Sequence, residues 1–225
     1  MAAKRVVVSG ASGLIGRALT ESLQQDDVDV IHLVRRPARS AREVEWLTDD
    51  RPLSPDVLAG ADAIVNLNGA SISRLPWTSG YRTMLYESRL RPTRILSASL
   101  TALGNDAPAF LSASAVGYYG DRAGASVDEG SPAGDTFLAG LCVEWERAAL
   151  AAADTTRVVL LRTAPLLHPD AVLKPMIALT RWGLGGSLGP GTQLWPWLSL
   201  TDEVGAIRHL IDGTQAGPVN LSGPT

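Results

Sequence analysis

The sequence predicts an α/β fold in which helices cover both faces of a doubly wound parallel sheet, and two observations support this prediction. First, short apolar runs rich in β-branched residues recur along the chain and are too continuous for strands of a half-exposed sheet. Second, the segments between these runs place apolar residues at helical spacing. Strands that alternate with helices form βαβ units, whose right-handed crossovers give a doubly wound sheet.

The elements follow from these patterns in chain order. Five apolar runs are the expected strands: Val6–Val8, Val28–Val34, Ala63–Leu67, Ala109–Leu111 and Val158–Leu161. Three helices are expected between them, over Leu14–Gln25, Tyr81–Leu103 and Leu138–Ala152. Residues 37–60 form a connection with a short helix before Gly60. Near the end, the Thr201 hydroxyl is expected to cap a helix, and Pro218–Leu221 to form a last strand.

Composition bounds the class of protein. With 225 residues, 45% hydrophobic residues, 19% charged residues and a net charge of −3, the chain has the make-up of one globular domain. This charge argues against nucleic acid as a partner. Cys142 is the single cysteine, so no disulfide or metal-binding cysteine cluster is expected. No signal peptide or membrane-length apolar run is present, and we expect a cytoplasmic protein with no membrane partner and no metal site.

A glycine-rich turn follows the first expected strand and leads into an amphipathic helix. Its glycines are Gly10, Gly13 and Gly16, a GxxGxxG spacing rather than GxGxxG. In a dinucleotide-binding turn, Gly10 would shape the turn, Gly13 would remove a Cβ that blocks the pyrophosphate, and Gly16 would let helix and strand pack closely. The expected cofactor-binding residues here are Gly10, Ser12, Gly13, Leu14, Ile15 and Gly16.

The second expected strand indicates which dinucleotide binds. In NAD-selective folds a carboxylate about twenty residues past the glycines binds the ribose 2′-hydroxyl, whereas this strand ends in Arg35 and Arg36. Two guanidinium groups suit a 2′-phosphate, which favours NADP as the cofactor. The alternative is a solvated basic turn. After the third strand, Asn68, Gly69 and Ala70 are expected to pass close to the cofactor's ribose and phosphates.

The chain changes character after about residue 164. We expect residues 1–164 to form the NADP-binding core, and residues 165–225 a partial substrate lobe interleaved with the last helix and strand of the core. The segment from Trp182 to Trp197 is rich in glycine, proline and tryptophan. It is either a turn-rich hairpin that packs its tryptophans into a small core or a lining for a ligand.

Several segments together carry a family resemblance. They are Gly10–Gly16, Asp62–Ala70, Ser88-Arg89 with Thr93, Ser112–Asp121, Leu161–Thr163 and Gly183–Gly189. On these the chain resembles the atypical extended short-chain dehydrogenase/reductases often labelled nucleoside-diphosphate-sugar epimerase or cell-division inhibitor. The resemblance implies a Rossmann fold and an NADP(H)-dependent epimerase or oxidoreductase with a small-molecule substrate. Ala164 and Ser199 depart from the group, where glycine and histidine are usual.

The chain is also similar to a version of this group that lacks its C-terminal segment. We therefore expect an incomplete substrate lobe, with an apolar surface near residues 165–200 that is exposed or covered by another subunit.

Typical members of the group use a serine, a tyrosine and a lysine four residues later to move a proton as hydride moves. Ser114 matches the serine, the alternative being a turn hydroxyl bound to local backbone. Phe137 and Leu141 fall at the Tyr-x-x-x-Lys positions, so the standard pair is absent. Tyr119 is a substitute candidate with Arg122 as a nearby cation; the alternative is that Tyr118 and Tyr119 pack over the cofactor pocket.

Two functions remain open at this point. The first is an NADP-dependent oxidoreductase or epimerase-like enzyme of unknown substrate, with Ser114 and Tyr119 as catalytic candidates. The second is a catalytically silent NADP(H)-binding regulatory or scaffold protein. Both are compatible with an oligomer, and hydride turnover distinguishes them.

Overall fold

The computed structural model describes residues 4–122, 124–186 and 193–223. The strands are β1 (Arg5–Ser9), β2 (Asp29–Val34), β3 (Glu43–Glu45), β4 (Ala63–Asn66), β5 (Ala109–Ala115), β6 (Val158–Thr163) and β7 (Gly217–Leu221). The helices are α1 (Leu14–Gln24), α2 (Pro55–Leu58), α3 (Ser79–Leu103), α4 (Phe137–Leu150), α5 (Leu173–Arg181) and α6 (Leu200–Asp212). Two short 3₁₀ turns span Gly104–Asp106 and Val116–Tyr119.

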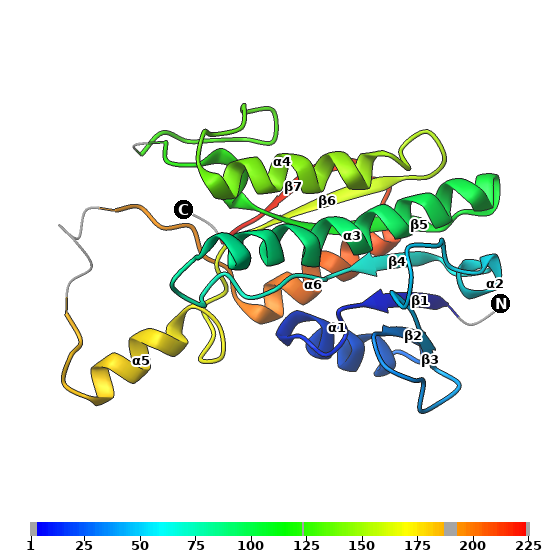
Figure 1. The fold of residues 1–225 in the computed structure, drawn as a ribbon, viewed down its shortest axis with the longest axis horizontal. Coiled ribbons are helices and arrows are strands. Elements are labelled where there is room, and N and C mark those ends of the chain that lie inside the picture. Colours follow the sequence, from blue (N-terminus) through cyan, green and yellow to red (C-terminus); the bar gives the residue numbers. More distant parts are fainter. Residues whose placement is uncertain (1–3, 123, 187–192, 224–225) are drawn as a thin grey trace.

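The strands form one parallel sheet in the order β3-β2-β1-β4-β5-β6-β7 (Figure 1). From β1 the chain winds outward to β3, then crosses to β4 on the other side of β1 and winds outward again to β7. The doubly wound α/β prediction is confirmed. Between β1 and β4 the direction of winding reverses, which in such sheets marks the place where ligands bind.

Helices cover both faces of the sheet. Successive strand residues point to opposite faces, so Val6 and Val8 join one core cluster and Val7 joins another. The first cluster includes Leu19 of α1 and Ile207 of α6. The second receives α3 and α4, with the side chains Ile95, Leu96, Leu100 and Ala149. Both clusters consist of fully or almost fully buried side chains, which explains why the strand sequences are continuously apolar.

The predicted helices and strands differ from the observed ones mainly at their ends and at the sheet edge. The cap of α6 is Ser199, whose Oγ accepts the Asp202 N–H at 3.0 Å, so the prediction of Thr201 as the cap is wrong. The sequence analysis did not predict β3 or α5. Strand β3 has only three residues, and α5 has no buried residue, so neither shows the burial pattern that identified the other elements.

The described residues between β6 and α6 lie largely outside the two packed layers, with α5 set apart from the sheet (Figure 1). Trp182, Trp195 and Trp197 are 82%, 52% and 42% exposed, so the interpretation that a hairpin packs these tryptophans into a core is wrong for them. Leu166 and Leu198 form an isolated bridge there. Residues 187–192 of the predicted hairpin lie outside the described residues. The apolar surface expected near residues 165–200 is exposed in this chain.

Candidate functional site

A cavity of about 410 Å³ lies at the carboxyl edge of the sheet, beside the point where the winding reverses. Three segments line it: the turn after β1, the end of β2 and the residues that follow β4. Its lining residues are Gly10, Ala11, Ser12, His32, Leu33, Val34, Arg35, Arg36, Glu43 and Asn68. A second cavity of about 550 Å³ lies between the C-terminal halves of α3 and α4, away from the strand ends that bind ligands in this topology.

The three glycines of the turn meet different surroundings. Gly10 has a φ of +79°, and a Cβ there would lie 2.6 Å from the Leu67 carbonyl oxygen. A Cβ on Gly16 would lie 2.4 Å from the Gly10 carbonyl oxygen, so Gly16 lets α1 approach its own preceding turn rather than a strand. A Cβ on Gly13 would meet only the Gly10 carbonyl oxygen within 4 Å, at 3.3 Å. Gly10 and Gly16 are therefore needed for packing, whereas Gly13 is the least crowded of the three.

The N-terminus of α1 offers unpaired donors next to Gly13. Gly13 is its N-cap, and no side chain caps the helix. The N–H groups of Leu14, Ile15 and Gly16 fall in the first turn, where an α-helix supplies no acceptor for them. The helix dipole adds a partial positive charge at the same end. Ser12 lines the cavity, and its carbonyl oxygen accepts a bond from Arg17 Nη1 at 2.8 Å. A pyrophosphate fits this arrangement of donors.

The segment after β4 is held in place by side chains from three other elements. Asn68 Nδ2 donates to Ser9 Oγ at 2.7 Å and to Asn66 Oδ1 at 2.9 Å. The Ala70 N–H donates to Ser88 Oγ at 2.9 Å, and the Ala70 carbonyl oxygen accepts from Arg89 Nη2 at 3.0 Å. Asn68 lines the cavity. Gly69 instead lies against Arg89, whose Cζ would be 3.0 Å from a Cβ at that position.

The two arginines after β2 differ in their contacts. Arg35 is exposed and has no hydrogen-bond or ion-pair partner within the described ranges. Arg36 donates from Nη1 and Nη2 to the two carboxylate oxygens of Glu43, at 2.7 and 2.6 Å. Glu43 also accepts the Arg39 N–H at 2.8 Å. These bonds, above all the one from Arg36, lower the pKa of Glu43 to about 2.

Glu43 supplies a carboxylate that the sequence did not predict at this cavity. The second strand itself ends without a carboxylate, but β3 pairs in parallel with β2 and places Glu43 opposite His32. The neighbouring edge strand thus supplies to the cavity the carboxylate that β2 lacks. His32 lines the same cavity, and its partial burial lowers its pKa, with the Glu43 charge acting in the opposite direction.

Ser114 belongs to a buried polar network that links β5, β6 and α4. Its hydroxyl donates to Glu146 Oε1 at 2.6 Å. Arg162 Nε and Nη2 donate to the Glu146 carboxylate at 2.8 and 2.9 Å. The side chains of Arg162 and Glu146 are only 3% and 7% exposed, so this is a buried ion pair between β6 and α4.

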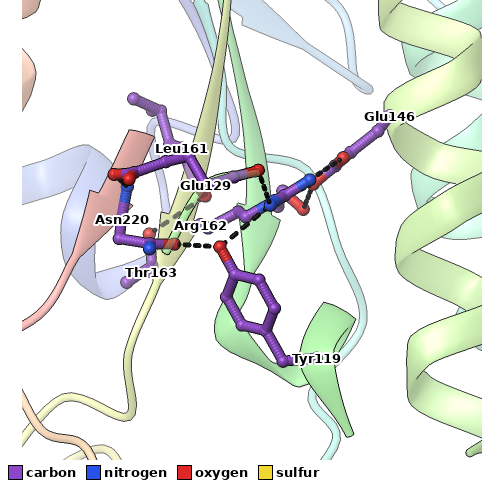
Figure 2. Close-up of polar contacts among 8 residues, drawn as sticks. Tyr119, Glu129, Glu146, Leu161, Arg162, Thr163 and Asn220 are labelled. Carbon is purple, nitrogen blue, oxygen red and sulfur yellow. Dashed lines mark hydrogen bonds and ion pairs between the residues drawn. The ribbon is translucent and has the colours of Figure 1, made fainter. Parts of the chain in front are cut away.

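Tyr119 connects this ion pair to β7. Its hydroxyl donates to Asn220 Oδ1 at 2.6 Å and accepts from Arg162 Nη1 at 2.9 Å (Figure 2). The Arg162 Cζ atom also lies 3.6 Å from the centre of the Tyr118 ring. Burial lowers the pKa of Arg162, but the bonds to Glu146 and Tyr119 outweigh it and raise this pKa overall. The cation beside the two tyrosines is therefore Arg162, whereas the expected Arg122 donates to the Pro132 carbonyl oxygen.

The positions of the missing tyrosine and lysine are filled by apolar packing. Phe137 begins α4 and contacts the rings of Trp77 and Tyr86, with centroids 5.6 and 5.7 Å away. Leu141, one turn later, is 2% exposed and packs in the same cluster. Neither side chain can donate a proton or carry a charge.

Known proteins share this fold. A model of the NAD dependent epimerase/dehydratase family matches residues 6–221. The chain belongs to this family. An epimerase family protein of Mycobacterium bovis is 42% identical over 227 residues, covering 100% of this chain and 75% of that protein. Further relatives place the chain in the atypical extended, epimerase-like group of short-chain dehydrogenase/reductases.

Two solved structures are similar over nearly the whole chain. The nucleoside-diphosphate sugar epimerase from Corynebacterium glutamicum superposes with a TM-score of 0.85 at 33% identity, covering 100% of this chain and 47% of that one. Human epimerase family protein SDR39U1 (isoform 2), solved with NADPH, superposes with a TM-score of 0.84 at 31% identity, covering 98% of this chain and 75% of that one. This epimerase family chain therefore has an NAD(P)-binding fold.

Four polar residues of the epimerase family chain were not predicted from the sequence as site residues: Glu43, Glu146, Arg162 and Asn220. Two of them carried a signal. Arg162 interrupts the apolar run of β6, and Glu146 lies beside Trp145 on a helix whose buried face is apolar. A charge inside a buried pattern indicates a buried partner. Among the described residues, no helix is long and apolar enough to cross a membrane, and no cluster of His, Cys, Asp or Glu could hold a metal ion.

Proposed function

We propose that the chain binds NADP(H), with the pyrophosphate at the N-terminus of α1 and the 2′-phosphate at Arg35 and Arg36. One observation carries the proposal: a single cavity is lined by the turn that leads into the uncapped helix α1 and by both guanidinium-bearing residues that follow β2. Gly13 would leave room for the pyrophosphate, and Asn68 would border the ribose next to it. The NADPH in the similar human structure supports the same choice of dinucleotide.

A titration with NADPH and NADH tests the cofactor. We expect NADPH to bind at least about tenfold more tightly, because a 2′-phosphate gains charge-assisted bonds that a 2′-hydroxyl does not. Arg35→Ala should weaken NADPH binding while leaving NADH binding nearly unchanged. Arg39→Ala is the matched control, since Arg39 lies in the same basic segment but outside the cavity lining. Equal affinities for NADPH and NADH in the unmodified chain contradict the proposal.

For the chemistry, the first candidate is an oxidoreductase or epimerase-like enzyme that acts on a small-molecule substrate. The bound cofactor would supply or accept hydride, Ser114 would orient the substrate and Tyr119 would move the proton. Residues 165–225 would form the partial substrate lobe around the last helix and strand. Incubation with NADPH and a panel of carbonyl compounds should give turnover that Ser114→Ala and Tyr119→Phe reduce.

The second candidate, NADP(H) binding without turnover, is favoured by the polar network. The hydroxyl protons of Ser114 and Tyr119 are both donated to protein groups, Glu146 and Asn220. Phe137 and Leu141 supply no replacement. Cofactor binding with no turnover, together with no effect of Tyr119→Phe, excludes the enzyme and supports this second function.

A further inference from the structure

The ribose end of the cavity contains one guanidinium that is ion-paired and one that is not. Both nitrogens of the Arg36 fork are bonded to Glu43, and both residues line the cavity. Glu43 is fixed from a second side by the Arg39 N–H, and its side chain is only 15% exposed. Arg35 has no such partner in the part of the chain that the structure describes.

A 2′-phosphate would need the group that Glu43 already binds. Carboxylate and phosphate both take an arginine fork through two parallel bonds, so they compete for the same edge of Arg36. The Glu43 charge would also repel a phosphate in the same cavity. Towards a ribose 2′-hydroxyl the effect is reversed, since a carboxylate accepts a bond from that hydroxyl, as in NAD-selective folds.

We propose that Glu43 determines dinucleotide selectivity by opposing the preference for NADP(H) that the two arginines confer. The proposal rests on the proposed NADP(H) function. Glu43 holds Arg36 as its own partner and lowers the gain from a 2′-phosphate, which leaves Arg35 as the principal contact. In the same position it accepts the 2′-hydroxyl of NAD(H), so the ratio of the two affinities is smaller than the two arginines alone would give.

Removal of the Glu43 charge tests this directly. Glu43→Gln keeps the size of the side chain and one acceptor oxygen but frees the Arg36 fork from its ion pair. We expect NADPH to bind about tenfold more tightly and NADH to bind equally or more weakly. Glu45→Gln is the matched control: it removes the same charge from the same strand, outside the cavity lining, and should change both affinities equally.

Smaller probes isolate the ribose end. 2′,5′-ADP and AMP differ only by the 2′-phosphate, and Glu43→Gln should raise the affinity for the former alone. In an Arg36→Ala background most of this gain in 2′,5′-ADP affinity should disappear, because there is then no Arg36 guanidinium for which Glu43 and the 2′-phosphate compete. If Glu43 only positions Arg36 for the phosphate, Glu43→Gln will weaken NADPH and 2′,5′-ADP binding, and this outcome, like an unchanged ratio, overturns the proposal.

Two failures can be told apart. If the unmodified chain binds no NADPH, or binds NADPH and NADH equally tightly in the presence of Arg35 and Arg36, the proposed function fails. If it prefers NADPH but Glu43→Gln leaves the ratio unchanged, only the role of Glu43 fails. Unfolding curves check that each variant folds, and Glu43→Thr, which suits a strand, is the second variant should glutamine disturb β3.

Discussion

Gly10, Gly13 and Gly16 produce one sequence signal but differ in what surrounds them. The motif spacing treats them alike, whereas a Cβ on Gly13 would meet a single atom, at 3.3 Å. Gly10 and Gly16 each have backbone atoms within 3 Å of their own Cβ position. We therefore expect binding of the proposed cofactor to depend on Gly13, and folding on Gly10 and Gly16.

This difference predicts opposite outcomes for two alanine variants. Gly13→Ala should fold with a nearly unchanged melting temperature, because its Cβ meets a single atom at 3.3 Å. It should weaken NADPH binding at least about tenfold by filling the space for the pyrophosphate. Gly16→Ala, the comparison variant, should lose stability as well as binding. Calorimetric titration and thermal unfolding measure both properties, and NADPH affinity that is unchanged in Gly13→Ala contradicts the placement.

Glu203 is a glutamate whose pKa is set by its surroundings. It is fully buried in the first turns of α6, and its Oε1 accepts the Thr163 hydroxyl at 2.9 Å. Its Oε2 has no partner within the described ranges. Burial raises the pKa of Glu203 to about 7, and the bond from Thr163 only partly offsets this. The folded chain therefore holds the Glu203 proton more tightly than the unfolded chain does.

Stability should consequently fall with rising pH. Below the unfolded pKa of 4.5 Glu203 is protonated in both states, and as the pH rises to the folded pKa of about 7 only the unfolded chain releases the proton. The separation of these pKa values amounts to about 3 kcal/mol, lost by about pH 8. Urea unfolding at pH 5 and pH 8 measures the loss. Glu203→Gln should abolish it, while the exposed Glu87→Gln should not, and equal pH slopes in all three proteins refute the assignment.

At the scale of elements, the Arg162–Glu146 pair joins β6 to α4 inside the protein. Removal of one member of such a pair leaves the other charge buried and uncompensated. Glu146→Gln should therefore lower the free energy of unfolding by about 3 kcal/mol or more. Glu144→Gln breaks an exposed pair with Arg147 on the same helix and should cost less than about 1 kcal/mol. Denaturant unfolding compares the two, and similar losses would contradict a structural role for the buried pair.

The sequence predicted the long elements because their signals are local. Apolar continuity located five of the seven strands, and helical spacing located α1, α3 and α4, to within a few residues. Strand β3 carries two glutamates in three residues, and its state depends on pairing with β2, which no local pattern records. The same pairing brings Glu43 to the cavity, so the missed strand and the missed site residue have one cause.

At the scale of the whole molecule, the glycine turn could be predicted and the polar network could not. The turn, the end of β2 and the segment after β4 each follow an apolar run directly, and parallel strands place their carboxyl ends at one edge. The network joins Tyr119 to Asn220, which are 101 residues apart, and Arg162 to Glu146 across two layers. Such pairings depend on how helices dock on the sheet, which spacing along the chain does not specify.

Between β6 and α6 the described residues include a set of exposed apolar side chains. Its members are Met176, Leu179, Trp182, Leu184, Leu194, Trp195 and Trp197, between 37% and 82% exposed. Surfaces of this kind promote association. We expect sedimentation to show a self-associated chain that non-ionic detergent returns to monomer, and Trp182→Ala with Leu184→Ser to reduce the association. A monodisperse monomer with and without detergent counts against this expectation.

The outer edge of β7 bears on how such association could occur. The backbone N–H and C=O groups of Leu221 and of every second residue before it point towards β6. The backbone groups of Pro218 and Asn220 therefore point outward. Proline has no N–H, and the Asn220 N–H donates to Glu129 Oε1 at 2.8 Å. The outward edge of β7 therefore offers carbonyl oxygens but no free N–H to a strand of another chain. This lack of donors disfavours edge-to-edge extension of the sheet on this side and makes side-chain contacts the favoured route for copies to meet.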